Sequence, residues 1–307
     1  MILQTSLAQQ IETLVTLTGT LQFSASKKYS SLEHLRKGYR AFLATLGQRP
    51  VDVDSTELAW ITDGDKVGAL RGLFSNDSLL DDKRQAIVIS EKRDDDCASK
   101  EARLTIALDE LTLCNSEYGE LFRTIVTDIF VLPSDVAKGG STSQAIGVIW
   151  ANPKLTYTVT DIAEILVHEF THHAMFLDEL RYGHYSYVAV LDESTWAHSA
   201  ILNVRRPLDK VLHSIIVATE VLLFRTEYLG HPARPRVHPP TDIMIAQLQD
   251  SISSTEKAVS KHKGIFQERA YQLLDNAKAS LRKVVGHHTH RNISGAQPVS
   301  TSVAATA

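Results

Sequence analysis

His168, Glu169 and His172 form a His-Glu-x-x-His motif, a spacing that suits metal chemistry. Residues four apart on a helix lie on one face about one turn apart, so both imidazoles can bind the same metal ion. Glu169 follows the first histidine and can act on a water molecule beside the metal or orient the ligands. The flanking residues are mostly apolar, and polar side chains buried among them need a partner. The motif therefore predicts a divalent metal held by His168 and His172, and a pair of hydrogen-bonded core histidines is the alternative.

A third ligand must come from another part of the chain. His213 lies in an apolar stretch of a second helix expected over Pro207–Tyr228, where a lone histidine would ordinarily be a satisfied core residue. Asp178 stands where an extended metzincin motif would place a ligand, but Met175 replaces the glycine that this motif needs for its turn. The remaining carboxylate candidates are Asp192, Glu193 and Glu220. The residues alone leave the third ligand open.

Short pieces of sequence around the motif carry a resemblance to a known family. They are a strand over Gly147–Trp150, the helix over Ile165–His172, Trp196 in the following loop, and Arg206-Pro207-Leu208 leading to Leu212-His213. With these pieces, the stretch from Val148 to Phe224 resembles the His-Glu-x-x-His proteins found beside peptide natural-product genes, which are read as iron- and 2-oxoglutarate-dependent peptide β-hydroxylases. The family pattern is roughly S-P-W-R, then R-P-L, then L-H-G. Here Thr195 replaces the proline, Ala197 the arginine after the tryptophan, and Ser214 the glycine.

The resemblance implies a non-haem iron(II), 2-oxoglutarate-dependent dioxygenase that hydroxylates a side chain of a peptide or carrier-bound substrate in natural-product biosynthesis. It makes His213 the preferred third ligand and gives Glu169 a role in orienting a histidine or water. The distal carboxylate of 2-oxoglutarate needs a cation, and Arg206 is the first candidate, roughly 10 Å from His213 if both were helical. Arg205 and Arg225 are its substitutes, because Arg206 precedes a proline and is biased away from helical angles.

Two other functions compete with hydroxylation. The first is a zinc metallopeptidase that uses Zn(II) alone, with Glu169 as the general base. Tyr182, His184, Tyr185 and Tyr187 follow the motif and could stabilise an oxyanion in such an enzyme. The second is a non-catalytic helical interaction protein that keeps a structural metal or none.

The sequence favours a mostly α (α+β) fold, a helical domain with a small β-sheet beside the His-Glu-x-x-His helix and a C-terminal helical hairpin. The helix with the motif is expected over Asp161–Leu180, with a capping box of Asp161 and Glu164 at its start. Four regions are expected along the chain: a helical N-terminal region that is a candidate peptide-binding part (1–140), a metal-binding catalytic core (141–235), the hairpin (236–285) and a disordered tail (286–307). The other expected elements are helices over Ile2–Gln22, Ser31–Leu46, Lys100–Leu113 and Glu120–Thr127, strands over Ala86–Ile89, Ile129–Leu132 and Ile146–Trp150, and a loop over Lys138–Ser143.

The bulk composition describes an ordinary globular chain. It has 307 residues, of which 43% are hydrophobic and 22% charged, a net charge of −4 and a pI near 6.3. No bulk positive field draws it to nucleic acid or to an anionic membrane. Cys97 and Cys114 lack a metal-ligand spacing and are expected to be reduced thiols. The first residues lack a basic stretch, and no apolar run reaches the roughly 18 residues of a membrane span, so we expect a cytoplasmic protein.

Overall fold

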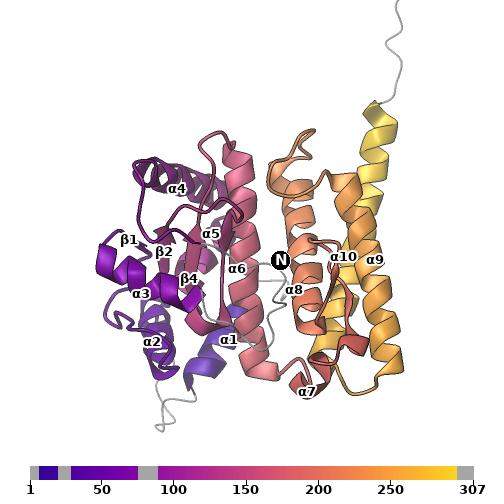
Figure 1. Ribbon diagram of the computed structural model, residues 1–307, viewed down its shortest axis with the longest axis horizontal. Helices are drawn as coiled ribbons and strands as arrows, with labels where there is room; N and C mark the ends of the chain where they lie inside the picture. The colour runs from indigo at the N-terminus through magenta and orange to yellow at the C-terminus, as the bar shows by residue number, and fades with distance from the viewer. Residues whose placement is uncertain (1–6, 20–28, 75–88, 296–307) are drawn as a thin grey trace, which may run out of the picture.

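The computed structural model describes residues 7–19, 29–74 and 89–295, and it is mostly helical with a small sheet, as the sequence predicts. The helices α6 and α8 lie side by side at the centre of the molecule (Figure 1). The sheet and helices α1 to α5 lie on one side of this pair, and α9 and α10 lie on the other. The helices are α1 (Leu7–Gly19), α2 (Leu32–Thr45), α3 (Gly64–Phe74), α4 (Cys97–Cys114), α5 (Ser116–Ile125), α6 (Val159–Tyr182), α7 (Tyr187–Val190), α8 (Leu208–Phe224), α9 (Thr241–Lys261) and α10 (Glu268–Gly295).

The main sheet has four strands in the order β1-β2-β4-β3. β1 (Ala59–Ile61), β2 (Asp128–Val131) and β4 (Val148–Ala151) run parallel, and β3 (Gly139–Gly140) pairs antiparallel with β4 at the edge. Successive side chains of a strand point to opposite faces. Ile129 and Ile149 therefore join the main core under the helices, whereas Phe130 and Trp150 join a smaller core beneath α3.

The edge strand β3 is a correction to the sequence prediction, which placed a loop over Lys138–Ser143. Gly139 pairs with Ala151 and Gly140 with Trp150, so two glycines form a short strand inside that loop. Glycine has a low strand propensity, and a two-residue strand carries no alternation, so the sequence gives no sign of it. The strand expected at Ala86–Ile89 falls outside the described residues, apart from Ile89.

The helix α6 begins earlier than predicted. Its N-cap is Thr158, whose side chain accepts a hydrogen bond from the backbone of Asp161, while the Asp161 carboxylate accepts one from the backbone of Thr158. The expected capping box of Asp161 and Glu164 is therefore wrong, because Asp161 is the third residue of the helix. Glu164 is left for a different role, described below.

The helix α8 is almost completely buried, and only Lys210 and Leu223 within it are partly exposed. Pro207 is its N-cap, and a π-helical turn over Arg225–Leu229 follows its last residue. Just before it, β5 (Ala197–His198) and β6 (Arg205–Arg206) form a small antiparallel pair.

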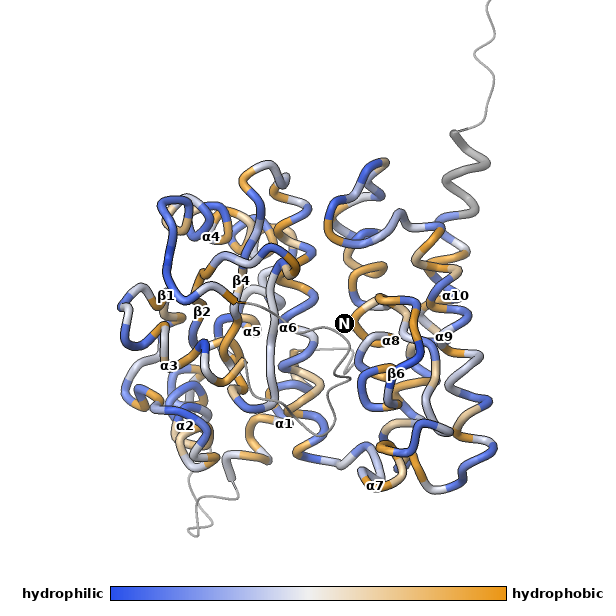
Figure 2. Tube along the Cα trace, viewed as in Figure 1, coloured by the Kyte–Doolittle hydropathy of each residue, from blue (hydrophilic) through white to orange (hydrophobic). Residues whose placement is uncertain are grey.

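The C-terminal hairpin consists of α9 and α10, which break at Gly264 with a positive φ of 87°. Hydrophobic and hydrophilic residues alternate along both helices (Figure 2), as expected when one face is buried. The prediction of a disordered tail over 286–307 is wrong for residues 286–295, because α10 continues to Gly295 on the same helical path after the buried Leu281 and Val284. Residues 296–307 lie outside the described ranges. Within those ranges, no helix combines the length and apolar character that crossing a membrane requires.

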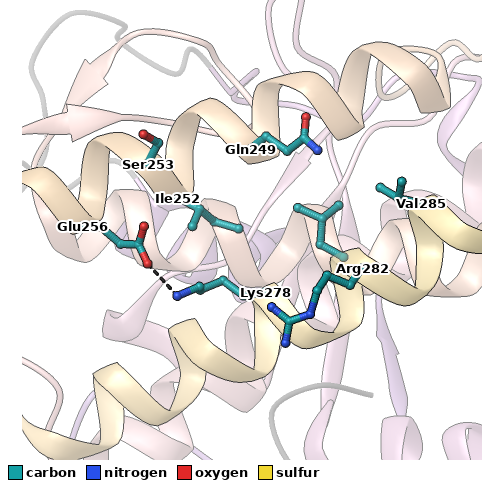
Figure 3. A pocket seen from close by; sticks show the side chains of 8 residues that line it. Gln249, Ile252, Ser253, Glu256, Lys278, Arg282 and Val285 are labelled. Atoms are coloured by element: carbon teal, nitrogen blue, oxygen red, sulfur yellow. Dashed lines mark hydrogen bonds and ion pairs between the residues drawn. The ribbon is translucent and has the colours of Figure 1, made fainter.

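A shallow groove lies between the hairpin helices (Figure 3). It has a volume of about 360 Å³, and the apolar residues in its wall are Ile252, Leu281 and Val285. Glu256 of α9 and Lys278 of α10 form an ion pair of 2.6 Å across it. All of its lining residues belong to α9 and α10, so the groove does not include the histidines of the motif.

Candidate metal centre

The His-Glu-x-x-His motif lies on α6 as predicted, and its histidines reach the surface of an otherwise buried helix. From Asp161 to Asp178 the partly exposed residues of α6 are His168, His172 and Phe176, and all others are buried. A spacing of four places these three side chains in one stripe on the helix. The stripe gives the histidines access to solvent in a stretch of helix whose other side chains are buried.

The two motif histidines present their Nε2 atoms to each other at 3.3 Å. Two ring nitrogens bound to one metal at about 2.05 Å in tetrahedral geometry would lie roughly 3.3 Å apart. Glu169 offers a carboxylate oxygen to the same group, whose ligand atoms all lie within 4.8 Å of one another. Among the residues that the structure describes, this is the group whose geometry could hold a metal ion, so the donor set fits one.

Glu169 is buried and held from the side of the edge strand. The Ser141 hydroxyl donates a 2.6 Å hydrogen bond to Oε2 of Glu169. A Cβ added to Gly139 would lie 3.5 Å from Oε1, so β3 passes directly beside this carboxylate. Burial raises the pKa of Glu169 to about 7, although the Ser141 hydrogen bond opposes the shift. The carboxylate is therefore fixed in place next to the histidine pair.

His213, the predicted third ligand, lies at the site, where it contacts one particular ring nitrogen of His172. Its Nδ1 lies 3.1 Å from Nδ1 of His172, on the ring nitrogen that does not face His168. Phe176 packs against both rings, with centroid distances of 6.3 Å to His172 and 5.2 Å to His213. With a metal on Nε2 of His172, His213 lies behind that ligand in this conformation, and it reaches the metal only if its ring turns.

A fourth histidine, His238, was not predicted. It lies in the proline-rich connector over 231–240, between α8 and α9, and its Nε2 is 2.9 Å from Nδ1 of His168. Its own Nδ1 is 3.0 Å from Oε2 of Glu164. Arg225 pairs with both oxygens of Glu164, through Nε at 2.6 Å and Nη2 at 2.9 Å. A chain of hydrogen bonds thus runs from a buried arginine to the first histidine of the motif.

The surroundings keep these rings neutral. Burial lowers the pKa of His168, His172 and His213 well below the usual histidine value. Lys138 adds to this effect at His168, and Lys210 adds to it at His172 and His213. A neutral imidazole keeps a lone pair, which is the form that binds a metal.

The adjacent His173 shows what a structural histidine looks like in this protein. Its Nδ1 accepts a hydrogen bond of 3.2 Å from the backbone N–H of Gly147, and its Nε2 lies 3.0 Å from the carbonyl of Val148. It is fully buried, and burial lowers its pKa to about 3. His168 and His172 differ, because each is partly exposed and turns its Nε2 toward another imidazole instead of a backbone group.

The carboxylates named as alternative ligands lie elsewhere. Asp178 is buried but accepts hydrogen bonds from His184 at 2.7 Å and from Arg269 at 2.6 Å, so its oxygens are engaged. Asp192 and Glu193 are exposed near the 3-10 turn over Glu193–Thr195. Glu220 is buried on α8, about two turns beyond His213. None of the four belongs to the group that could hold a metal.

The predicted cosubstrate cations have different surroundings. Arg206 is half-buried in β6, in the extended conformation that a following proline favours, and it leads directly into α8. Arg205 is exposed and donates to the carbonyls of Glu193 and Trp196. Arg225 is fully buried and committed to Glu164, so it is not a substitute. Among the aromatic candidates for an oxyanion site, Tyr185 is buried with its hydroxyl 3.5 Å from the carbonyl of Asp209, while Tyr182 and Tyr187 are exposed.

No protein-family model matches this chain, and no curated protein matches its sequence. The geometry of the site is therefore the main guide to its function.

Sequence reasoning missed His238, Ser141 and Lys138. Ser141 and Lys138 flank β3, which has no sequence signature of its own. His238 lies in an irregular segment, where no periodicity marks a residue as facing inward. The one signal in the sequence is its context, a histidine directly before two prolines, which fix the backbone of the segment.

Proposed function

We propose that this protein is a metal-dependent enzyme whose metal is held by His168 and His172, with His213 as the third ligand after its ring turns toward the metal. The observation that carries the proposal is the contact between His172 and His213, 3.1 Å apart although 41 residues separate them in the chain. His213 was singled out through the resemblance to peptide β-hydroxylases, and its place at the motif supports that resemblance.

The proposed reaction is hydroxylation of a peptide or amino-acid side chain by a non-haem iron(II), 2-oxoglutarate-dependent dioxygenase. Molecular oxygen is the oxidant of this reaction, and 2-oxoglutarate supplies two electrons as it becomes succinate and CO2. Bound iron(II) would supply the chemistry that inserts the other oxygen atom into a C–H bond. The chain supplies ligands on one face, and Arg206 is the proposed partner of the distal carboxylate of 2-oxoglutarate. Phe176 would form the apolar wall beside the histidines and limit water there. Glu169, fixed by Ser141, would orient a ligand or a water molecule.

Anaerobic titration tests this proposal. Iron(II) is added to the apo-protein, followed by 2-oxoglutarate, and the visible spectrum is searched for the weak charge-transfer band of the cosubstrate bound to iron. We expect a band that His168→Ala and His172→Ala abolish. Iron(II) binding without a band would exclude 2-oxoglutarate as cosubstrate. If chelators unfold the protein and no cosubstrate binds, the metal is structural and the interaction-protein alternative gains.

A second candidate function is zinc-dependent peptide hydrolysis, and the placement of Glu169 favours it. This buried carboxylate is held by Ser141 in the same group as His168 and His172, where it can take a proton from an attacking water. Zinc would supply the Lewis acid. Cleavage of generic peptides by the zinc-loaded protein, together with no spectral response to 2-oxoglutarate, would select this function over hydroxylation.

A further inference from the structure

The connector over 231–240 is pinned to the rest of the molecule at each residue from 236 to 239. The backbone N–H of Arg236 donates to Asp161, and its guanidinium donates to the carbonyl of Thr156. Lys138 donates a 2.8 Å hydrogen bond to the carbonyl of Val237. Arg225 donates a 2.8 Å hydrogen bond to the carbonyl of Pro239. The segment is therefore held by α6, by the residue before β3 and by the end of α8.

The residue at the centre of this pinned segment is His238, which is 5% exposed. The imidazole lies between Glu164 and His168, with a different ring nitrogen directed to each. Its ring lies nearly parallel to that of His168, at a centroid distance of 5.1 Å and an interplanar angle of 17°. Both the backbone and the ring of His238 are thus fixed with respect to the first histidine of the motif.

The direction of each hydrogen bond follows from Arg225. The guanidinium binds both oxygens of Glu164, which keeps this carboxylate ionised and able only to accept. Nδ1 of His238 must therefore carry its proton. A neutral imidazole has one ring proton, so Nε2 of His238 is an acceptor, and Nδ1 of His168 must donate to it. The proton of His168 is then on Nδ1, and its Nε2 lone pair points toward Nε2 of His172.

We propose that His238 is a positioning residue of the metal centre, which, backed by Glu164 and Arg225, fixes His168 in the tautomer and orientation that present Nε2 to the metal. This inference rests on the proposed metal site and adds to it a residue that the motif and the resemblance do not name. A histidine ligand whose second nitrogen donates to a fixed acceptor is held in place and made more basic. Here the acceptor is the imidazole of His238. The negative charge of Glu164 polarises this ring and makes it a stronger acceptor for the proton of His168.

A purely structural role would have different consequences. A structural His238 would tie the connector to α6, and its loss would lower the stability of the apo-protein without a specific effect on metal affinity. A positioning His238 sets the metal affinity and the tautomer of His168. Metal affinity and the tautomer of His168 therefore distinguish the two roles, because a change in folding stability alone affects neither.

The experiment uses cobalt(II) as the probe, with the full-length protein and its variants titrated by visible absorption. We expect His238→Ala to weaken cobalt(II) binding by about 10- to 100-fold, the usual effect of removing a partner behind a metal ligand. His238→Gln should recover part of the affinity, because an amide also pairs an acceptor with a donor. The matched control is His231→Ala, in the same connector, whose ring contacts Thr241 and His288 instead of α6. It should bind like the wild type.

A second readout needs no variant and no metal. In the ¹⁵N NMR spectrum of the wild-type apo-protein near neutral pH, the His168 proton should be on Nδ1. A proton on Nε2 of His168 overturns the proposal, as does unchanged cobalt(II) affinity in His238→Ala or an equal loss in His231→Ala. A loss as complete as that of His168→Ala would make His238 a ligand and overturn its positioning role. A wild-type protein that binds no cobalt(II), iron(II) or zinc(II) would instead overturn the proposed function itself, and this inference with it.

Discussion

Nδ1 of His213 lies 3.1 Å from Nδ1 of His172, on the opposite nitrogen of that ring from the one that faces His168. His172 is therefore the central ring of the site, with one nitrogen toward each of two other histidines. Two roles of His213 are compatible with this contact. His213 is either a ligand whose ring must turn toward the metal, or a hydrogen-bond acceptor that fixes the ring of His172 through its Nδ1.

The substitution His213→Ala distinguishes these roles. If His213 is the third ligand, as we propose, its loss should weaken metal binding well beyond the 10- to 100-fold range of a residue behind a ligand. The measurement is a competition titration with a chromophoric chelator, with His168→Ala as the reference for a lost ligand. A loss confined to the 10- to 100-fold range would place His213 behind His172 and contradict the ligand assignment.

Glu169→Gln separates the two enzyme reactions. We expect the variant to keep its metal, because His168 and His172 are unchanged and the amide can still accept the hydrogen bond from Ser141. In a hydrolase the loss of the general base should reduce the rate by about 10² to 10⁴-fold. In a hydroxylase the rate should fall far less, because no step needs a base at this position. The assay is turnover with each substrate class at saturating metal. Loss of metal from Glu169→Gln would show that this carboxylate is itself a ligand.

Arg206→Ala tests the proposed cosubstrate contact. A charge-assisted hydrogen bond contributes about 1.5–3 kcal/mol, so the Kd for 2-oxoglutarate should rise by roughly 10- to 100-fold. Arg205→Ala is the matched control, since this neighbouring arginine is exposed and bonds to the carbonyls of Glu193 and Trp196. Equal effects of the two substitutions would argue against a specific contact. If Lys210→Ala raises the Kd for 2-oxoglutarate and Arg206→Ala does not, the cation that binds the cosubstrate is Lys210 of α8.

Asp178 gives a pH dependence of stability. Burial alone would raise its pKa, but the hydrogen bonds from His184 and Arg269 outweigh burial and hold the pKa below its usual value. A carboxyl group whose folded-state pKa is lowered stabilises the fold above its unfolded pKa of about 3.9, and this stability is lost as the pH falls further. We expect Asp178→Asn to cost about 3 kcal/mol at neutral pH, the low end for breaking a buried pair, because Arg269 is partly exposed.

Urea denaturation at several pH values measures this effect. The stability difference between the wild type and Asp178→Asn should be constant at neutral pH and shrink below about pH 4. Asp275→Asn, on the same helix as Arg269 but exposed, should change stability by less than about 0.5 kcal/mol. Metal affinity should be unaffected in both variants. A difference that stays constant down to pH 2, or a loss of metal in Asp178→Asn, would contradict this account.

The sequence predicts the helix that carries the His-Glu-x-x-His motif well because the relevant information is local. Two histidines four residues apart, set in an apolar segment, define both the helix and the face on which they lie. The mostly helical class with a small sheet follows in the same way from the periodicity of each segment. The ends of α6 were less predictable, since Thr158 and Asp161 share the cap and only the backbone geometry reveals which residue precedes the first turn.

The partners of the motif could not be predicted, because they depend on how distant segments pack. His238 is 70 residues from His168, and it reaches the site only because the connector is folded back over α6. Glu164 looked like part of a helix cap, yet its role is set by Arg225, 61 residues further along the chain. Hydrogen bonds of this kind leave no spacing pattern in a single sequence.

The stripe of α6 that holds His168, His172 and Phe176 also shapes how this protein can diverge. Most substitutions along a packed helix disturb the core and are removed by selection for stability. Phe176 lies on the partly exposed stripe one turn from the second histidine, so a change there alters the wall of the site while the buried face stays intact. A related chain with another residue at this position would present a different wall beside the same histidines on the same scaffold.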